Sequence, residues 1–274
     1  MKKQDNARKN GREKRIKLSD DILFGIHPVE EALKEEVARV VELVLLKDRH
    51  GNRLEEIIAL ARKNKVKISF VSALKIIGEG ASQIRHQGVV ARMSHTALLP
   101  FAEMVEKFRV RVEQGEMPRL IACDSLQDPH NLGAIIRSAH ASGMAGVLIT
   151  RENSAPLGGA AAKASAGATS HIDISQVTNL ATALQQLKDA GAWIFGAVKD
   201  SDAQSLYRTD LRLPACFVVG SEGKGIRPLI RKQCDVLTSI PMEGSLDSLN
   251  SSVAAGVIMF EALRQNLAKK DQKE

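Results

Sequence analysis

Short apolar segments alternate with amphipathic segments along the second half of this chain. This alternation predicts a parallel β-sheet with helices on both faces, because each helix returns the chain to the start of the next parallel strand. A run of small residues from Gly158 to Ser170 is expected to be one of these helices. The predicted strands are Leu120–Asp124, Val147–Thr150, His171–Ile174, Trp193–Val198, Cys216–Gly220 and Val236–Pro241. The predicted fold class is therefore α/β.

The first half of the chain predicts a second, smaller α/β unit of about 70 residues. A helix is expected around Phe24–Leu33, since Pro28 suits the first turn of a helix. Strands are expected at Val40–Leu46 and Val66–Val71. The segment between them has apolar residues at helical spacing, namely Leu54, Ile57, Ile58 and Ala61.

A change in composition at 94–118 predicts a linker between these two units. This segment contains an expected helix, Phe101–Gln114, and the alternative is that the helix packs on one of the two domains. The predicted division is a basic flexible tail (1–21), an N-terminal domain (22–93), the linker (94–118), a C-terminal domain (119–268) and a charged tail (269–274).

The positive charge is concentrated at the start of the chain. The net charge is +7, and Met1–Ser19 holds eight basic and two acidic residues, which leaves +1 for the rest. A flexible basic segment binds phosphate backbones without regard to sequence, although it can also serve only to increase solubility. Aromatic residues make up 3% of the chain, so stacking of bases on exposed rings is not the main expected mode of nucleic-acid binding.

Several classes of protein are disfavoured by the composition. The apolar runs have the length of strands, so we predict no signal peptide, no transmembrane helix and a cytoplasmic location. Cys123, Cys216 and Cys234 lack metal-ligand spacing and are expected to be reduced thiols, mostly buried. The seven histidines form no ligand cluster, so no metal site is predicted. Neither a membrane nor DNA is expected as a partner.

Three turns rich in Gly, Ser and Asn follow predicted strands and precede predicted helices. They are Asp128–Gly133, Val219–Gly225 and Ile240–Ser251. Ligands of open α/β sheets bind beyond the carboxyl ends of the strands, so the fold is expected to join these turns into one site.

The first turn suggests a helix with one charged side chain off its buried face. Asn131 is expected to be the N-cap, followed by one apolar face made of Leu132, Ile135, Ile136 and Ala139. Arg137 lies about 140° from the centre of that face at about 100° per residue. Such an arginine can bind phosphate, although a solvated surface arginine would have the same spacing.

The second and third turns lack the patterns of common nucleotide sites. Val219–Gly225 has neither the Lys-Ser/Thr ending of a P-loop nor a Gly-x-Gly-x-x-Gly pattern, so ATP and dinucleotides are not indicated. Glu222 is either a capping carboxylate or a site residue. The third turn offers Ser245, Ser248, Asn250, Ser251 and Ser252, more than one helix cap needs. The following helix has an apolar stripe that suits either the core or a second subunit: Leu249, Val253, Gly256, Val257, Phe260 and Leu263.

Together these motifs resemble the signature of the SpoU (TrmH-type) RNA ribose 2′-O-methyltransferases. The resemblance rests on Asn131-Leu132-Gly133 with Arg137, Gly220-Ser221-Glu222-Gly223 and Ser248-Leu249-Asn250. Gly25–Glu30 and His86-Gln87-Gly88 are similar to the substrate-binding domain of the RlmB-like branch, so the resemblance covers Phe24 to Gln265.

The resemblance implies an S-adenosylmethionine-dependent homodimeric enzyme whose C-terminal SPOUT domain contains a deep trefoil knot, an exception among folds. Cofactor contacts are implied for Val219, Gly220, Ile240, Met242 and Leu249. Arg137 is implied to activate the ribose hydroxyl with help from an RNA phosphate, and its high pKa favours an electrostatic role over that of a base. His130 is the rival base. Orienting roles are implied for Asn131, Glu222, Ser248 and Asn250.

The substrate implied by the resemblance is a guanosine of 23S rRNA, in the peptidyl-transferase region, either in free RNA or in a pre-50S particle. Transfer RNA is the alternative substrate within this enzyme class. A noncatalytic RNA-binding or ribosome-assembly factor is the alternative from a different class.

Overall fold

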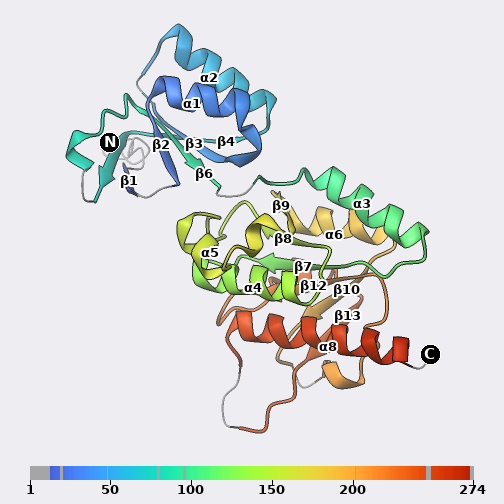
Figure 1. Ribbon diagram of the computed structural model, residues 1–274. Coiled ribbons are helices and arrows are strands. Elements are labelled where there is room, and N and C mark those ends of the chain that lie inside the picture. Colours follow the sequence, from blue (N-terminus) through green and yellow to red (C-terminus); the bar gives the residue numbers. More distant parts are fainter. Residues whose placement is uncertain are drawn as a thin grey trace, which may run out of the picture. The chain divides into compact units, whose positions relative to one another are not determined.

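A computed structural model describes residues 13–18, 21–47, 49–78, 81–94, 97–200, 202–244 and 248–271. The chain divides into two compact units, Met1–Ala97 and Leu98–Glu274. Each unit has its own sheet, as Figure 1 shows. Residues 1–12, in which most of the predicted basic tail falls, lie outside the described residues.

The N-terminal unit is built on a four-stranded mixed sheet covered by two helices. The strand order is β2-β6-β3-β4, with β3 parallel to β4 and antiparallel to β6. The strand expected at Val40–Leu46 is β3, with the same bounds. The other elements are β2 (Ile22–Phe24), α1 (Ile26–Glu35), η1 (Val37–Arg39), α2 (Asn52–Lys63), β4 (Lys67–Val71) and β6 (Val89–Met93).

Strand β1 (Glu13–Lys17) corrects the predicted extent of the flexible tail. It pairs in parallel with β5 (Ala73–Ile77), which the 3₁₀ helix η2 (Ala81–Gln83) follows along the chain. Ile16 is 1% exposed and packs with Val71, Leu74 and Val90. Residues 13–17 therefore belong to the folded unit, because one buried isoleucine holds this polar strand in the core.

The C-terminal unit confirms the α/β prediction. Its seven strands lie in the order β11-β13-β10-β12-β7-β8-β9, and all their pairings are parallel. Their bounds are β7 (Arg119–Asp124), β8 (Gly146–Thr150), β9 (Asp173–Val177), β10 (Trp193–Ala197), β11 (Gln204–Ser205), β12 (Ala215–Gly220) and β13 (Val236–Ser239).

Helices cover both faces of this sheet, and alternate residues of β7 divide between two cores. Ile121 and Cys123 pack in the core under α4 (Pro129–Ala141) and α8 (Ser251–Asp271). Leu120 and Ala122 pack in the core under the helices of the opposite face. The remaining helices are α3 (Phe101–Glu113), α5 (Gly159–Ala164), η3 (Ala168–Ser170), α6 (Leu180–Asp189), η4 (Leu206–Arg208) and α7 (Pro228–Arg231).

The structure differs from the predicted elements, or decides between alternatives, at three places. The helix expected at Gly158–Ser170 ends at Ala164, because Ala166 (φ 50°) and Gly167 (φ 87°) turn the chain before η3. The third strand runs Asp173–Val177, not His171–Ile174. In the predicted linker, α3 packs on the C-terminal unit through Met104, Val105 and Phe108. The trefoil knot and the remaining domain limits stay predictions.

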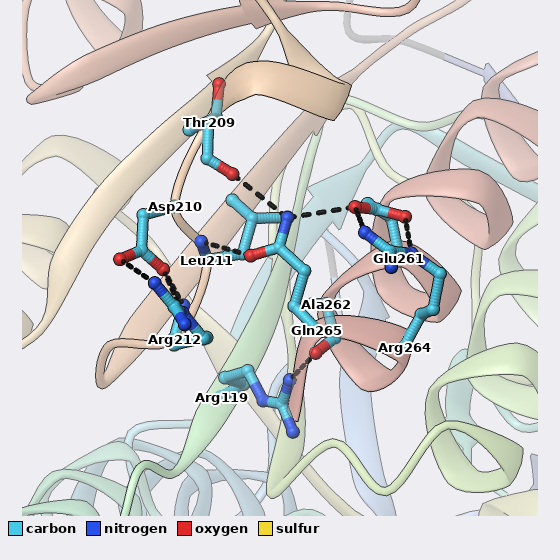
Figure 2. Close-up of polar contacts among 9 residues, drawn as sticks. All are labelled: Arg119, Thr209, Asp210, Leu211, Arg212, Glu261, Ala262, Arg264 and Gln265. Atoms are coloured by element: carbon cyan, nitrogen blue, oxygen red, sulfur yellow. Dashed lines mark hydrogen bonds and ion pairs between the residues drawn. The ribbon is translucent and has the colours of Figure 1, made fainter. Parts of the chain in front are cut away.

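Polar contacts hold the C-terminal half of α8 against β7 and the segment that precedes β12 (Figure 2). Gln265 accepts a hydrogen bond from the Leu211 amide at 2.9 Å and donates to the Thr209 carbonyl at 3.0 Å. The buried Arg119 guanidinium, from the start of β7, donates to the Ala262 carbonyl. These contacts fix the direction of α8, whose other end carries Asn250 into the site described next.

Two of the three cysteines are buried in this unit, as expected. Cys123 and Cys216 are 1% and 0% exposed, and burial raises the pKa of the Cys123 thiol to about 12. Both thiols are therefore unreactive at neutral pH. No described helix is long and apolar enough to cross a membrane.

Candidate functional site

Side chains from all three turns meet at the carboxyl ends of β7 and β12. The Asn131 amide nitrogen donates to Oε1 of Glu222 at 2.9 Å. The Asn250 amide nitrogen donates to the same carboxylate oxygen and to the Asn131 amide oxygen, the latter at 3.1 Å. These residues are 91 and 119 positions apart in sequence from Asn131, so the fold alone brings them together.

Asn131 has a different structural role from the one expected. The N-cap of α4 is Asp128, whose Oδ1 accepts a hydrogen bond from the His130 amide at 2.9 Å, and Pro129 is the first helical residue. Asn131 lies in the first turn and is 7% exposed. Because the cap is made by Asp128, the Asn131 side chain is left to join the second and third turns.

Asn250 links the cap of α8 to this cluster. Its Oδ1 accepts hydrogen bonds from the amides of Ser252 (2.8 Å) and Val253 (3.4 Å), as an N-cap does. Its amide nitrogen is then directed to Glu222 and Asn131. The next residue, Ser251, donates from its hydroxyl to the Gly220 carbonyl at 3.0 Å. The third turn is therefore held against the second at two points.

The second turn is a tight loop that requires its glycines. Gly225 donates its amide to the Ser221 carbonyl at 2.9 Å, and Gly223 and Gly225 have φ values of 78° and 64°. A Cβ atom on Gly220 would lie 2.0 Å from the carbonyl carbon of Gly225. Since backbone cannot move aside, only glycine fits at position 220.

A cavity of about 250 Å³ opens beside this loop. Its wall contains the five residues predicted to bind the cofactor: Val219, Gly220, Ile240, Met242 and Leu249. Glu222 and Ser248 also line it. Among the described residues, the amides of Ile240 and Met242 have no protein hydrogen-bond partner, so they remain available to a ligand.

Within one chain, Arg137 does not contact the cluster of Asn131, Glu222 and Asn250. It is exposed on α4, almost two turns after Asn131, and makes no hydrogen bond or ion pair with the described residues. Its apolar neighbours Leu132, Ile135, Ile136 and Ala139 are buried, as expected. His130 is exposed at the start of α4, and Ser245 of the third turn lies outside the described residues.

The site also contains an ion pair with a buried carboxylate, which the sequence pattern did not single out. Asp124, the last residue of β7, is 0% exposed. It accepts hydrogen bonds from the Arg227 amide at 2.8 Å and from the Arg227 Nε at 2.7 Å. The polar end of an otherwise apolar strand was the available signal for Asp124. Among the described residues, no group of three His, Cys, Asp or Glu side chains is placed to hold a metal ion.

Comparisons with known proteins identify the family of this chain. Residues 118–260 match the model of the SpoU rRNA Methylase family, and residues 22–96 match a model described as RNA 2′-O ribose methyltransferase substrate binding. The chain is 41% identical over 245 residues to the 23S rRNA (guanosine-2′-O-)-methyltransferase RlmB of Shewanella oneidensis, covering 89% of this chain and 97% of that protein.

Two solved structures share the fold. The AdoMet-bound rRNA methyltransferase of Sinorhizobium meliloti has a TM-score of 0.56 and 23% identity, covering 89% of this chain and 86% of that one. The TrmH/SpoU tRNA modifying enzyme of A. aeolicus has a TM-score of 0.53 and 27% identity, covering 62% of this chain and 86% of that one. The motifs, both family models and the similarity along most of its length lead to one conclusion: the chain belongs to the SpoU rRNA methylase family.

Proposed function

We propose that this protein transfers a methyl group from S-adenosylmethionine to a ribose 2′-hydroxyl of RNA, most specifically to a guanosine of 23S rRNA. The observation that carries the proposal is the contact of Asn131, Glu222 and Asn250, which joins all three motif turns beside one cavity. The similarity to RlmB of Shewanella oneidensis supports the choice of substrate.

The cavity wall suits the chemistry of this cofactor. Val219, Ile240 and Leu249 offer apolar surface to a flat adenine ring, and the amides of Ile240 and Met242 offer hydrogen-bond donors. The methionine end of the cofactor carries an ammonium and a carboxylate group, and both signs of charge are present in the wall. When bound, the cofactor supplies an electrophilic methyl group.

Positioning is the main task of the protein in this reaction. In-line transfer requires the ribose oxygen about 3–3.5 Å from the methyl carbon, opposite the leaving sulfur. Glu222 Oε1 accepts hydrogen bonds from the side-chain amides of Asn131 and Asn250. Its other oxygen, Oε2, has no hydrogen-bond partner among the described residues. That oxygen is available to orient the ribose hydroxyl, while Asn131 and Asn250 hold the turns around it and Ser248 lines the cavity for an orienting contact.

Arg137 is assigned an electrostatic role. A guanidinium stays protonated at neutral pH, so it binds an RNA phosphate and stabilises the negative charge that develops on the ribose oxygen. The hydroxyl proton then passes to that phosphate or to water. The exposure of Arg137 in one chain fits a group that contacts RNA or a second subunit.

A homodimer is part of this proposal. The face of α8 that packs on its own core consists of Ala255, Ile258, Met259 and Ala262. Of the stripe noted in the sequence, Val257 packs partly against this core, whereas Val253 and Phe260 are 50% and 46% exposed. Leu267, further along α8, is 51% exposed. Apolar side chains so placed on one long helix favour burial against a second copy.

The N-terminal unit offers basic side chains for RNA. Arg53 contacts the His27 ring nitrogen Nε2 at 2.6 Å, and His86 accepts a hydrogen bond from the Gly88 amide at 3.0 Å. Burial and, secondarily, the charge of Arg49 lower the pKa of His86, which leaves this ring neutral at pH 7. The Arg53 and Arg49 charges beside the two histidines suit phosphate contacts.

The test is transfer of labelled methyl from S-adenosylmethionine to 23S rRNA transcripts, pre-50S particles and bulk tRNA. We expect label in rRNA, and we expect Arg137→Ala to reduce transfer at least about 100-fold, since a lost electrostatic group costs about that much. Calorimetry should find cofactor affinity within a few-fold of wild type.

Arg109→Ala removes an exposed arginine of α3 and is the matched control. Label only in tRNA would support ribose methylation as the reaction but would show that tRNA, and not 23S rRNA, is the substrate. Absence of cofactor binding would favour the noncatalytic assembly factor, and a collapse of cofactor affinity in Arg137→Ala would assign that residue to architecture.

A further inference from the structure

A second cavity, of about 440 Å³, lies next to the cofactor cavity. The two cavities share one wall, formed by Ser221, Glu222, Lys224 and Gly225. Three loops bound the second cavity: the end of β7, the end of β8 and the second turn. Its other lining residues are Ser125, Leu126, Gln127, Asp128, Asn131, Asn153 and Arg227.

Two residues in the wall of this cavity have left-handed backbone conformations. Ser125 and Asn153 have φ values of 59° and 56°, and only five non-glycine residues of the described chain have positive φ. The Ala155 amide donates to the Leu126 carbonyl at 2.6 Å, which ties the two loops together. Asparagine tolerates this conformation, so Ser125 is the strained residue of the wall, and strain of this kind is concentrated at functional sites.

One cation is fixed at the edge of this cavity. Asp124 is fully buried and holds the Arg227 backbone amide at 2.8 Å and its guanidinium Nε at 2.7 Å. Because the carboxylate is anchored in the sheet, the guanidinium plane has a defined orientation. About half of the Arg227 side chain (49%) remains exposed, which leaves donors for a ligand.

The remaining polar groups supply both donors and an acceptor. Lys224 is exposed and its ammonium group has no partner among the described residues. Asp128 uses Oδ1 to cap α4, and its Oδ2 has no partner there. The cavity thus presents two cations and the Asp128 carboxylate oxygen from another loop, with the Glu222 carboxylate in the wall shared with the cofactor cavity.

This arrangement matches the hydrogen-bonding groups of guanine. Guanine has acceptors at O6 and N7 and a donor at the 2-amino group, with a further donor at N1. Lysine and arginine donate to O6 and N7, while a carboxylate accepts from N1 and the amino group. Adenine has an amino group where guanine has O6, so the same cations would meet a donor.

We propose that this second cavity binds the guanine base of the nucleotide that is methylated, with Asp128, Lys224 and Arg227 as specificity-determining residues. The proposal rests on the proposed function. Enzymes that do chemistry on a base take it out of the stack into a pocket, and the same extrusion would bring the attached ribose to the shared wall. With the base here, its ribose lies at the shared wall beside Glu222, facing the cofactor cavity.

The experiment places single guanosine analogues in the rRNA fragment that wild type methylates, at the mapped position. Inosine lacks the 2-amino group and 7-deazaguanosine lacks N7. We expect wild type to lose about 10-fold in kcat/KM on each analogue, the order of one good base contact. Asp128→Asn keeps a good N-cap, so α4 stays intact.

Asp128→Asn should lose about 10-fold on guanosine and discriminate guanosine from inosine by less than about 2-fold, because the contact to the amino group is already lost. Lys224→Ala should no longer discriminate guanosine from 7-deazaguanosine, because its contact to N7 is already lost. It should still discriminate guanosine from inosine. Cofactor affinity should stay within a few-fold of wild type in Asp128→Asn, since Asp128 lines the second cavity and not the cofactor cavity. Asp189→Asn, an exposed aspartate of α6, is the control.

Unchanged discrimination in both variants, with wild-type transfer intact, would overturn the proposal. So would methylation by wild type of a nucleotide other than guanosine, although methyl transfer itself would then stand. A large loss of cofactor affinity in Asp128→Asn would show that this residue supports the cofactor cavity instead. Absence of transfer to any RNA would contradict the proposed function itself.

Discussion

At the scale of single residues, Glu42 shows how a buried carboxylate is stabilised. It lies on β3 and is 7% exposed. Burial acts to raise its pKa, but hydrogen bonds from Lys14 (2.8 Å) and Ser69 (2.7 Å) outweigh burial and the pKa is lowered. The carboxylate therefore connects β1, through Lys14, to the sheet of the N-terminal unit.

Glu42→Gln should destabilise the N-terminal unit at pH 7 by about 1–3 kcal/mol, the value of charge-assisted hydrogen bonds. A carboxyl whose folded pKa is lowered stabilises the fold above its unfolded pKa, about 4.5, and loses that contribution as pH falls through the folded value. The difference between wild type and variant should therefore shrink below about pH 4.5.

Urea titrations at pH 7 and below, with hydrogen exchange at β3 amides, measure this difference. Glu36→Gln removes an exposed ion pair with Arg39 and should cost little at either pH. A difference between wild type and Glu42→Gln that stays constant with pH would contradict the account.

Residue roles were only partly predictable from the sequence. The five cofactor-cavity residues were expected from the resemblance, and all of them line one cavity. The cap of α4 was misplaced because Asp128 and Asn131 are both good caps, and Pro129 selects the earlier one. Arg227 could not be predicted, since its partner Asp124 is 103 residues away.

At the scale of elements, α4 and α5 pack so closely that a glycine is needed between them. A Cβ on Gly133 would lie 2.5 Å from the Ala161 carbonyl oxygen and 2.5 Å from the Ala164 Cβ. The small residues of α5 make this approach possible. The contact holds the start of α4, and with it Asn131, against its neighbours.

Gly133→Ala should destabilise the C-terminal unit, because overpacking against backbone costs about 1–3 kcal/mol and exceeds the gain in helix propensity of about 1 kcal/mol. Gly256→Ala in α8 is the matched variant, since its nearest contact would be the Ser138 hydroxyl at 3.9 Å. That change should stabilise by about 0.5–1 kcal/mol. Denaturation midpoints that move in the same direction would refute this packing argument.

The sequence predicted elements best where apolar strands alternate with amphipathic helices over a long stretch and the strands are buried on both faces. Strand β11 has two residues and β2 has three, too few for a periodic signal. Strand β1 is polar except for Ile16, so composition placed it in the tail. The pairing of β1 with β5 depends on tertiary contacts that no local pattern contains.

At the scale of the whole molecule, the exposed apolar side chains of α8 lead to a prediction of assembly. Phe260→Asp should convert a dimer into a folded monomer, because Phe260 is 46% exposed in one chain and its change leaves the core intact. Sedimentation measures the mass. Leu229→Asp, at an apolar residue 62% exposed on α7, should leave the dimer unchanged.

A wild-type protein that remains monomeric at micromolar concentration would count against the proposed homodimer. So would a Phe260→Asp variant that keeps the dimeric mass. Transfer activity should fall with the dimer if Arg137 acts at the interface.

The convergence of the three turns was predictable, because parallel strands end at one edge of the sheet. The second cavity was not, since it depends on Asn153 and Arg227, which lie outside the recognised motifs. It also depends on the left-handed backbone conformation of Ser125, which a serine in the sequence does not reveal.

The loop Ser221–Gly225 lies between the two cavities and lines both of them. A ligand that shifts this loop in one cavity reshapes the other. Thermodynamic reciprocity then requires that the factor by which the first ligand changes affinity for the second equals the factor in the opposite direction. Because this five-residue loop lines both cavities, it is the element through which binding of the methyl donor and binding of its acceptor would be coupled.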